Sequence, residues 1–363
     1  PLLQRRLQIV AVGAAVPEKI DNLDAAGHAD RLGADQPVVD FSAQRRQDLR
    51  RNPRREQQCD QRCGKPFRQQ VSLTFSATLP EQKATSGGGG LKVSVGAATG
   101  PRMPRIGLGV AADEAAPSVA AAALVKKIGP QVLVCQLDGR RSDNEVVARH
   151  YKALADATGA AVTLEIIIPG SSAAGAAATE IAPIAAAVAA AGLKPADISI
   201  TPAAHLKAVL PGSKGPDCVT HADMYAAARA AFPGLPLGGG MFSFFTELNR
   251  IRPPAALLDF VTHTVAPIVH AADDVSVMET LESHPYIIHS TRQFAGGKPY
   301  RVGPSAVPAR DNPYGKASAE NPGNGRVCLS RMDPRQRGLF GAAWLFGYIA
   351  GFARGGLDVV SVG

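Results

Sequence analysis

The chain has 363 residues, of which 45% are hydrophobic and 19% charged, so it can bury a large core. Its formal net charge is +8, but the charge is not evenly spread: residues 71–363 are only mildly basic, and they hold no basic patch interleaved with aromatic side chains. We therefore expect no nucleic-acid partner. The apolar run from Gly338 to Ala353 is shorter than the about 20 residues that a membrane-spanning helix needs, so we expect no membrane association either.

The five cysteines are an odd number and lie far apart, which argues against a disulfide framework and favours a reducing cytoplasm. Cys59 and Cys63 are the only close pair, and neither a second pair nor a histidine follows at the spacing of a zinc site. We predict no metal and no cofactor.

Residues 1–70 show no convincing hydrophobic periodicity, and the stretch from Gln44 to Gln70 is dense in arginine and glutamine. This segment is either a disordered basic tail or not native coding sequence. We favour the second interpretation, because the composition changes abruptly near Val71. The chain also begins at Pro1 rather than at a methionine, which is typical of a truncated N-terminus.

Residues 71–100 predict one strand and a linker. The stretch from Val71 to Ala77 alternates like a strand, which we interpret as the remnant of an upstream β domain. Gly87 to Gly90 form a flexible linker.

Residues 101–363 alternate short β-rich runs with alanine-rich helical runs, which predicts an α/β fold of the (β/α)₈ TIM barrel type. The expected strands are Ile106–Val110, Val132–Leu137, Val162–Ile168, Ile198–Thr201, Leu235–Gly239, Phe260–Val265, Tyr300–Gly303 and Leu357–Val362. The expected helices are Ser118–Ile128, Asp143–Thr158, Ala173–Ala191, His221–Phe232, Pro254–Asp259, Ser276–Ser283 and Pro334–Arg354. A closed barrel requires the first strand to pair with the last.

Two helix starts have recognisable caps. Asp333 precedes Pro334, and Ser276 with Glu279 matches a capping box. The chain ends at Gly363 without an eighth helix, so we expect a barrel that is truncated at this end.

That truncation predicts an exposed apolar patch beside the last strand. Leu339, Trp344, Phe346 and Phe352 on the seventh helix would lose a neighbour.

In a (β/α)₈ barrel the active site lies on the loops at the C-terminal ends of the strands. The loop after the fifth strand holds Glu247, Asn249 and Arg250 behind three glycines and three phenylalanines, and we expect Asn249 and Arg250 to bind substrate. An apolar setting raises the pKa of a carboxyl towards acid–base work, so Glu247 is a candidate base. The alternative is that Glu247 only pairs with Arg250 or Arg252.

The sixth strand and the loop after it carry the densest polar cluster, formed by His263, His270, Asp273 and Asp274. These residues could serve as base, orienting group and substrate donor, or hold a metal, which we consider less favoured. The alternatives are a core histidine at position 263 and helix capping by one of the aspartates.

The connection after the seventh strand is long and irregular, from Gly303 to Asp333. Arg301, Arg310 and Asn312 lie in or beside it and suit recognition of a carboxylate or of polyol oxygens, unless they are only solvated surface.

Several segments together resemble the D-apionate lactonase family of bacterial sugar catabolism, over roughly residues 71–363. They are Thr246–Arg250 with Arg252–Pro254, Asp259–Thr264, Pro267–Asp274, Arg310–Gly315 and Asp333–Phe340. The resemblance implies a central barrel flanked by β domains and the hydrolysis of an aldonolactone to its acid. The chain departs from the family in lacking the N-terminal β domain and the last barrel helix.

The first functional hypothesis is therefore lactone hydrolysis by general-base attack of water. Glu247 or His263 would be the base, Asp273 or Asp274 would orient a histidine, and His270 and Arg301 would be donors to the substrate.

The second hypothesis is a glycoside hydrolase that pairs Glu247 with Asp273, Asp274 or Glu165. The third is a carbohydrate-binding or inert barrel, in which the polar strand-end residues would not converge.

Overall fold

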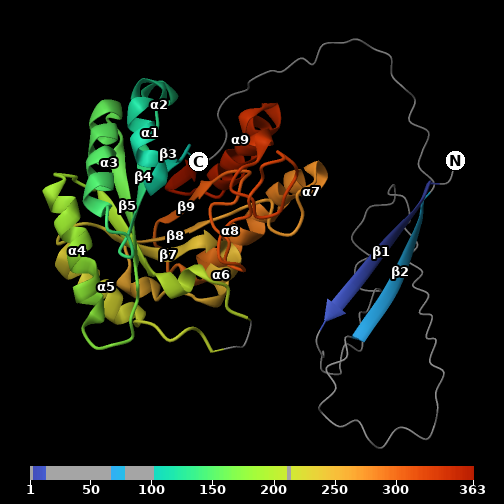
Figure 1. The fold of residues 1–363 in the computed structure, drawn as a ribbon, viewed down its shortest axis with the longest axis horizontal. Coiled ribbons are helices and arrows are strands. Elements are labelled where there is room, and N and C mark those ends of the chain that lie inside the picture. The colour runs from blue at the N-terminus through green and yellow to red at the C-terminus, as the bar shows by residue number, and fades with distance from the viewer. Residues whose placement is uncertain (1–2, 14–66, 78–101, 211–213) are drawn as a thin grey trace, which may run out of the picture. The chain divides into compact units, whose positions relative to one another are not determined.

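The computed structural model describes residues 3–13, 67–77, 102–210 and 214–363, which fall in two compact units, Pro1–Val95 and Gly96–Gly363. In the first unit, strand β1 (Leu3–Gly13) pairs antiparallel with β2 (Phe67–Ala77) (Figure 1). The strand expected from Val71 to Ala77 is therefore present as part of β2. Strand β1 and the first four residues of β2 lie in the segment for which we expected no structure. The rest of that segment, with Cys59 and Cys63, lies outside the described residues.

The second unit is a closed barrel of parallel strands in the order β10-β3-β4-β5-β6-β7-β8-β9 (Figure 1). The strands are β3 (Arg105–Val110), β4 (Val132–Asp138), β5 (Ala161–Ile168), β6 (Asp197–Pro202), β7 (Leu237–Phe244), β8 (Phe260–Thr264), β9 (Tyr300–Ser305) and β10 (Val359–Val362). The predicted closure is confirmed, because Val359 of β10 pairs with Arg105 of β3 on one side and with Arg301 of β9 on the other.

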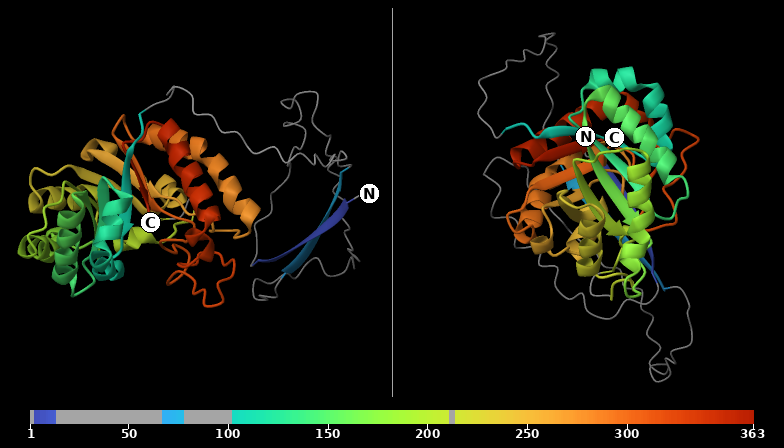
Figure 2. Two further views of the ribbon diagram at one scale, coloured as in Figure 1. Left: turned by 90° about the horizontal axis from the view of Figure 1, so that it is seen from above. Right: turned by 90° about the vertical axis from the view of Figure 1, so that its left-hand side faces the viewer.

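Helices connect the strands and lie outside the barrel; Figure 2 shows the green helices α3 to α5 on one side and the orange and red helices α8 and α9 on another. The helices are α1 (Ala115–Ala120), α2 (Ala122–Ile128), α3 (Asn144–Thr158), α4 (Ala176–Ala190), α5 (His221–Ala231), α6 (Phe245–Arg250), α7 (Asp274–Glu279), α8 (His284–Phe294) and α9 (Leu339–Arg354).

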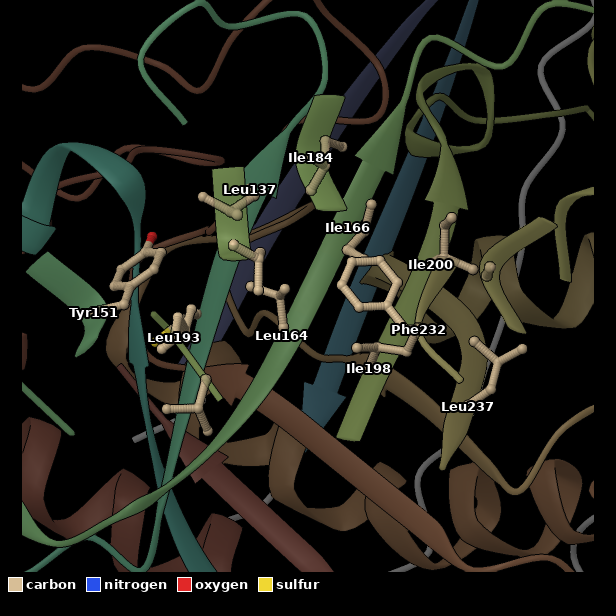
Figure 3. Close-up of a cluster of buried hydrophobic side chains, with 14 of the residues drawn as sticks. Leu137, Tyr151, Leu164, Ile166, Ile184, Leu193, Ile198, Ile200, Phe232 and Leu237 are labelled. Carbon is tan, nitrogen blue, oxygen red and sulfur yellow. The ribbon is translucent and has the colours of Figure 1, made fainter. Parts of the chain in front are cut away.

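The outer faces of the strands form the apolar core beneath these helices. Figure 3 shows Leu164 and Ile166 of β5 and Ile198 of β6 packed against Ile184 of α4 and Phe232, which follows α5. The inner faces are more polar, and among the described residues they line a small cavity of about 10 Å³ at the centre of the barrel. This cavity has room for about one water molecule.

In the region of the fifth barrel strand, the structure differs from the sequence prediction at one helix and at the end of the strand. The helix predicted over Pro254–Asp259 is wrong, since only the 3-10 turn Ala255–Leu257 forms there. Strand β7 instead continues to Phe244 and leads directly into α6.

Glycines allow this continuation. A Cβ atom on Gly240, whose φ is 150°, would lie 1.8 Å from the carbonyl oxygen of Thr262 on β8. Only a glycine permits this close approach of β7 to β8.

The predicted capping box at Ser276 and Glu279 is also wrong. Asp273 is the N-cap of α7, and its carboxylate accepts a hydrogen bond from the backbone N–H of Ser276 at 3.0 Å. The cap at Asp333 is confirmed, because its carboxylate accepts from the N–H of Arg335 at 2.9 Å. It caps a short 3-10 helix, Pro334–Arg337, and α9 begins after it.

Helix α9 carries part of the expected apolar patch. Leu339 and Phe346 are 90% and 77% exposed, whereas Trp344 and Phe352 are fully buried. The patch is therefore narrower than expected, because the inner face of α9 packs on α8 and on the barrel. Across the described ranges, the helices are too short or too polar to cross a bilayer.

Candidate active site

One segment crosses the C-terminal ends of three neighbouring strands. This segment, residues 310–315, is called the strap here, and it belongs to the connection between β9 and α9. It is bound to Glu165 of β5, to Lys207 in the connection after β6, and to Glu247 in α6, which follows β7. The strap therefore brings strand-end residues that are distant in the sequence into one site.

The first attachment is a buried ion pair between Arg310 and Glu165. The guanidinium donates through Nη1 to Oε1 at 3.2 Å and through Nη2 to Oε2, so the pair is bidentate. Gln136 of β4 donates a further hydrogen bond to Oε2 at 3.2 Å. The Glu165 side chain is 2% exposed, and Arg310 is its ion-pair partner.

The second attachment holds the strap in shape. The Lys207 ammonium donates to the carbonyl oxygens of Asn312 and Gly315 at 3.0 and 2.8 Å. The side chain of Asn312 accepts from the N–H of Tyr314 at 3.0 Å and donates to the carbonyl of Ala317 at 2.8 Å. Asn312, which we expected to bind substrate, is placed here as a residue that shapes the strap.

The third attachment is to Glu247, which is fully buried. The Tyr314 hydroxyl donates to its Oε1 at 3.2 Å, and Nη1 of Arg250 lies 3.8 Å from the same oxygen. Oε2 is buried and has no hydrogen-bond partner among the described residues. Burial raises the pKa of this carboxyl. The backbone N–H of Glu247 itself, the bond from Tyr314 and the charges of Arg250 and His270 offset part of that rise, in this order.

The alternative for Glu247, a simple surface ion pair, does not fit these contacts. Arg250 approaches one oxygen at the long distance of 3.8 Å. Arg252 instead donates to the side chain of Asn249 at 2.6 Å and to its carbonyl at 3.2 Å. Asn249, expected to bind substrate, is thus tied to Arg252 on the outer side of α6.

His263 lies in the core, which is the alternative that the sequence left open. Its Nδ1 donates to the carbonyl of Thr264 at 2.8 Å, and the Tyr300 hydroxyl donates to its Nε2 at 2.6 Å. The ring is fully buried, and burial lowers its pKa to about 4. Both ring nitrogens are engaged in hydrogen bonds, so neither is available to take a proton, and the structure does not support His263 as the base.

The two aspartates after β8 lie at the start of α7 and not beside a histidine. Asp273 caps this helix, and its hydrogen bonds with Ser276 lower its pKa. Asp274 forms ion pairs with Arg326 and Arg335 at 2.6 and 2.8 Å, and the hydrogen bonds from these arginines lower its pKa to about 2. Neither placement supports the predicted roles in orienting a histidine, binding substrate or forming a glycosidase pair with Glu247.

His270 is the member of this cluster that reaches the site. It is exposed, and its ring centroid lies 6.2 Å from that of Tyr314. Its charge also affects the carboxyl of Glu247.

Arg301 lies at the opposite end of the barrel. As the second residue of β9 it forms ion pairs with Asp197 at 2.9 Å and with Asp358 at 3.2 Å, inside the barrel near the N-terminal ends of the strands. Its guanidinium carbon also lies 3.6 Å from the centroid of the Phe260 ring. The predicted role in substrate binding is not supported, because these contacts make Arg301 part of the barrel floor.

Sequence reasoning did not select Tyr314 or Gln136 as site residues. Gln136 interrupts an otherwise apolar strand, Val132–Leu137, and that interruption was an available signal. Tyr314 lies within the segment Arg310–Gly315 that carried the family resemblance, but nothing in its local pattern shows that it reaches Glu247. In the part of the chain that the structure describes, no three histidine, cysteine or acidic side chains converge as metal ligands.

The chain forms a closed eight-stranded barrel, and buried glutamates lie beneath the strap at the strand ends. This arrangement is typical of (β/α)₈-barrel proteins, which have their site on the loops at the C-terminal ends of the strands. Within this class, the chain belongs to the D-apionate lactonase family, because residues 106–363 match the D-apionate lactonase TIM barrel domain. The family resemblance expected from the sequence is thus confirmed.

A curated relative supports this assignment. The chain is 41% identical over 299 residues to the D-apionate lactonase of Brucella anthropi, and the match covers 82% of this chain and 48% of the relative. The chain therefore spans about half the length of that relative.

Two solved structures are similar to the chain at low sequence identity. A GH2 β-galacturonidase of Eisenbergiella tayi has 13% identity and a TM-score of 0.44, with 72% of this chain and 43% of that one covered. A β-glucuronidase of Bacteroides uniformis has 10% identity and a TM-score of 0.46, with 72% and 30% covered. Likeness at this level carries no information on activity.

Proposed function

We propose that the protein hydrolyses a sugar lactone to the corresponding hydroxy acid, with Glu247 as the general base. The observation that carries this proposal is the buried Glu247 carboxyl, whose Oε2 has no partner among the described residues. A carboxyl with a raised pKa and one free oxygen suits the removal of a proton from water. The curated relative is a D-apionate lactonase, so the lactone of D-apionate is the substrate that we propose, in sugar catabolism.

The reaction then runs as follows. Oε2 of Glu247 takes a proton from a water molecule while the water oxygen attacks the carbonyl carbon of the ring ester. The carbonyl oxygen becomes an oxyanion, which Arg310 stabilises, since only two of the five N–H groups of its guanidinium are used on Glu165. When the ring C–O bond breaks, the departing oxygen takes the proton from Glu247, and the base is restored.

Replacing Glu247 by glutamine tests the base directly. We expect Glu247→Gln to reduce turnover of an aldonolactone by about 100-fold or more, because the amide cannot accept the proton. The matched control is Glu279→Gln, which changes an exposed glutamate on α7 and should leave turnover unchanged. Ester hydrolysis can be followed by the acid released at constant pH, and thermal melting of each variant checks that it folds.

Near-normal turnover of Glu247→Gln would remove Glu247 from the mechanism. Hydrolysis of aryl glycosides in place of lactones by the unmodified chain would instead overturn the reaction class and favour the glycosidase hypothesis.

A further inference from the structure

We propose that Tyr314 is a positioning residue of this reaction: by occupying Oε1 of Glu247, it assigns Oε2 as the oxygen that takes the proton. This inference rests on the proposed function, because it concerns the same carboxyl. It adds a residue of the strap to the site, and it explains why one glutamate oxygen is bonded and the other is not.

The contacts of the carboxyl are one-sided. The Tyr314 hydroxyl, at 3.2 Å, and Nη1 of Arg250, at 3.8 Å, both approach Oε1 of Glu247. Oε2 is equally buried but unbonded among the described residues. Because a hydroxyl and a guanidinium stabilise negative charge on the oxygen that they contact, a proton is held more readily on the other oxygen.

Tyr314 can select this oxygen because the strap fixes its backbone. The side chain of Asn312 accepts from the N–H of Tyr314, and Lys207 binds the carbonyls on both sides of the turn. Gly315 belongs to the same arrangement, since a Cβ there would lie 2.8 Å from Nδ2 of Asn312. The phenol is therefore aimed by a network that does not depend on Glu247 itself.

The hydrogen bond also sets the pH range of the base. Burial raises the pKa of Glu247, and the bond from Tyr314 lowers it again. Without the hydroxyl, the carboxylate loses a partner that favours its charged form, and its pKa must rise further. The base would then be protonated, and inactive, at a higher pH than in the unmodified protein.

The experiment compares the dependence of kcat/KM on pH in the unmodified chain and in Tyr314→Phe, with an aldonolactone as substrate. We expect the acid limb of the profile to move upward by about one pH unit, because this limb reports the pKa of the base in the free enzyme. At high pH, most of the activity should return. The ring stays in place in this variant, and Tyr314 is 47% exposed, so folding should be unaffected.

Tyr286→Phe is the matched control, because Tyr286 lies on α8 and is 76% exposed. Its profile should coincide with that of the unmodified chain. Gly315→Ala tests the strap by a different route: displacing Asn312 should move the acid limb in the same direction as Tyr314→Phe.

The outcomes separate this inference from the proposed function. If Glu247→Gln abolishes turnover but Tyr314→Phe leaves the acid limb where it is, Tyr314 has no positioning role. A loss of kcat/KM by the same factor at every pH would assign Tyr314 to packing and would also overturn the inference. If Glu247→Gln remains active, the proposed function fails, and this inference fails with it.

Discussion

Replacing Arg310 by methionine should lower the free energy of unfolding by about 3–5 kcal/mol, the range found when one partner of a buried ion pair is removed. The Glu165 side chain is 2% exposed and that of Arg310 20%, so the remaining carboxylate would stay buried without its counter-charge. Gln136, the other side chain that donates to Glu165, is neutral and cannot replace the lost charge. Urea-induced unfolding of Arg310→Met and of the unmodified chain measures the difference.

Two further variants make this measurement specific. Arg140→Met removes an arginine that is 51% exposed, and its partner Asp138 is 16% exposed. Water reaches this pair more than the buried one, so the change should cost less, about 1 kcal/mol. Adding Glu165→Met to Arg310→Met removes the unpaired charge and should restore a large part of the lost stability. If Arg310→Met is no more harmful than Arg140→Met, the buried pair is not what holds the strap to β5.

Acidification should destabilise the barrel between about pH 6.5 and pH 4. His205, His263 and His284 are buried, and burial is the largest cause that lowers the pKa of each from its ordinary 6.5 to about 4. In the unfolded chain they take up protons near pH 6.5, whereas the folded chain resists protonation until about pH 4. The unfolded state therefore binds more protons in this window, and stability falls as the pH falls through it.

The expected size is on the order of 3 kcal/mol per histidine by pH 4, since one pKa unit corresponds to about 1.4 kcal/mol. Urea unfolding at intervals from pH 7 to pH 4.5 measures it. His284→Leu should reduce the pH dependence by the share of one histidine, because the ring packs on Phe352 and its Nδ1 has no partner among the described residues. His289→Gln, an exposed change on the same helix, is the control. A constant free energy of unfolding from pH 7 to pH 5 would contradict the prediction.

The strands were predictable because each is a short apolar run whose outer face must be covered, and the barrel strands lie within a few residues of the predicted ones. Helix α8 was missed, since His284 to Phe294 mixes histidine, serine, threonine and arginine with few apolar residues. The end of β7 was missed because a run of glycines is typical of a loop. Here it allows β7 to approach β8 closely.

The site was less predictable, because a role in catalysis depends on where a side chain points. Arg301 lies in the seventh barrel strand and Arg310 in the loop after it. They are only nine residues apart in the sequence, yet they form ion pairs at opposite ends of the barrel. His263 has a side chain that is chemically suited to act as a base. Only the three-dimensional structure shows that both its ring nitrogens are already hydrogen-bonded. Tyr314 reaches Glu247 only because the strap crosses three strand ends, and no local pattern encodes that path.

The filled centre of the barrel limits how the substrate preference could be redesigned. A void of about 10 Å³ has room for roughly one water molecule, and below it Arg301 closes the floor through Asp197 and Asp358. Replacing the inward-facing side chains of the strands by smaller ones would break these ion pairs before it created a cavity large enough for a ligand. Variants that accept a lactone bulkier than the proposed substrate should therefore be sought in the length and sequence of the loops at the rim, where new volume can be gained without disturbing the barrel.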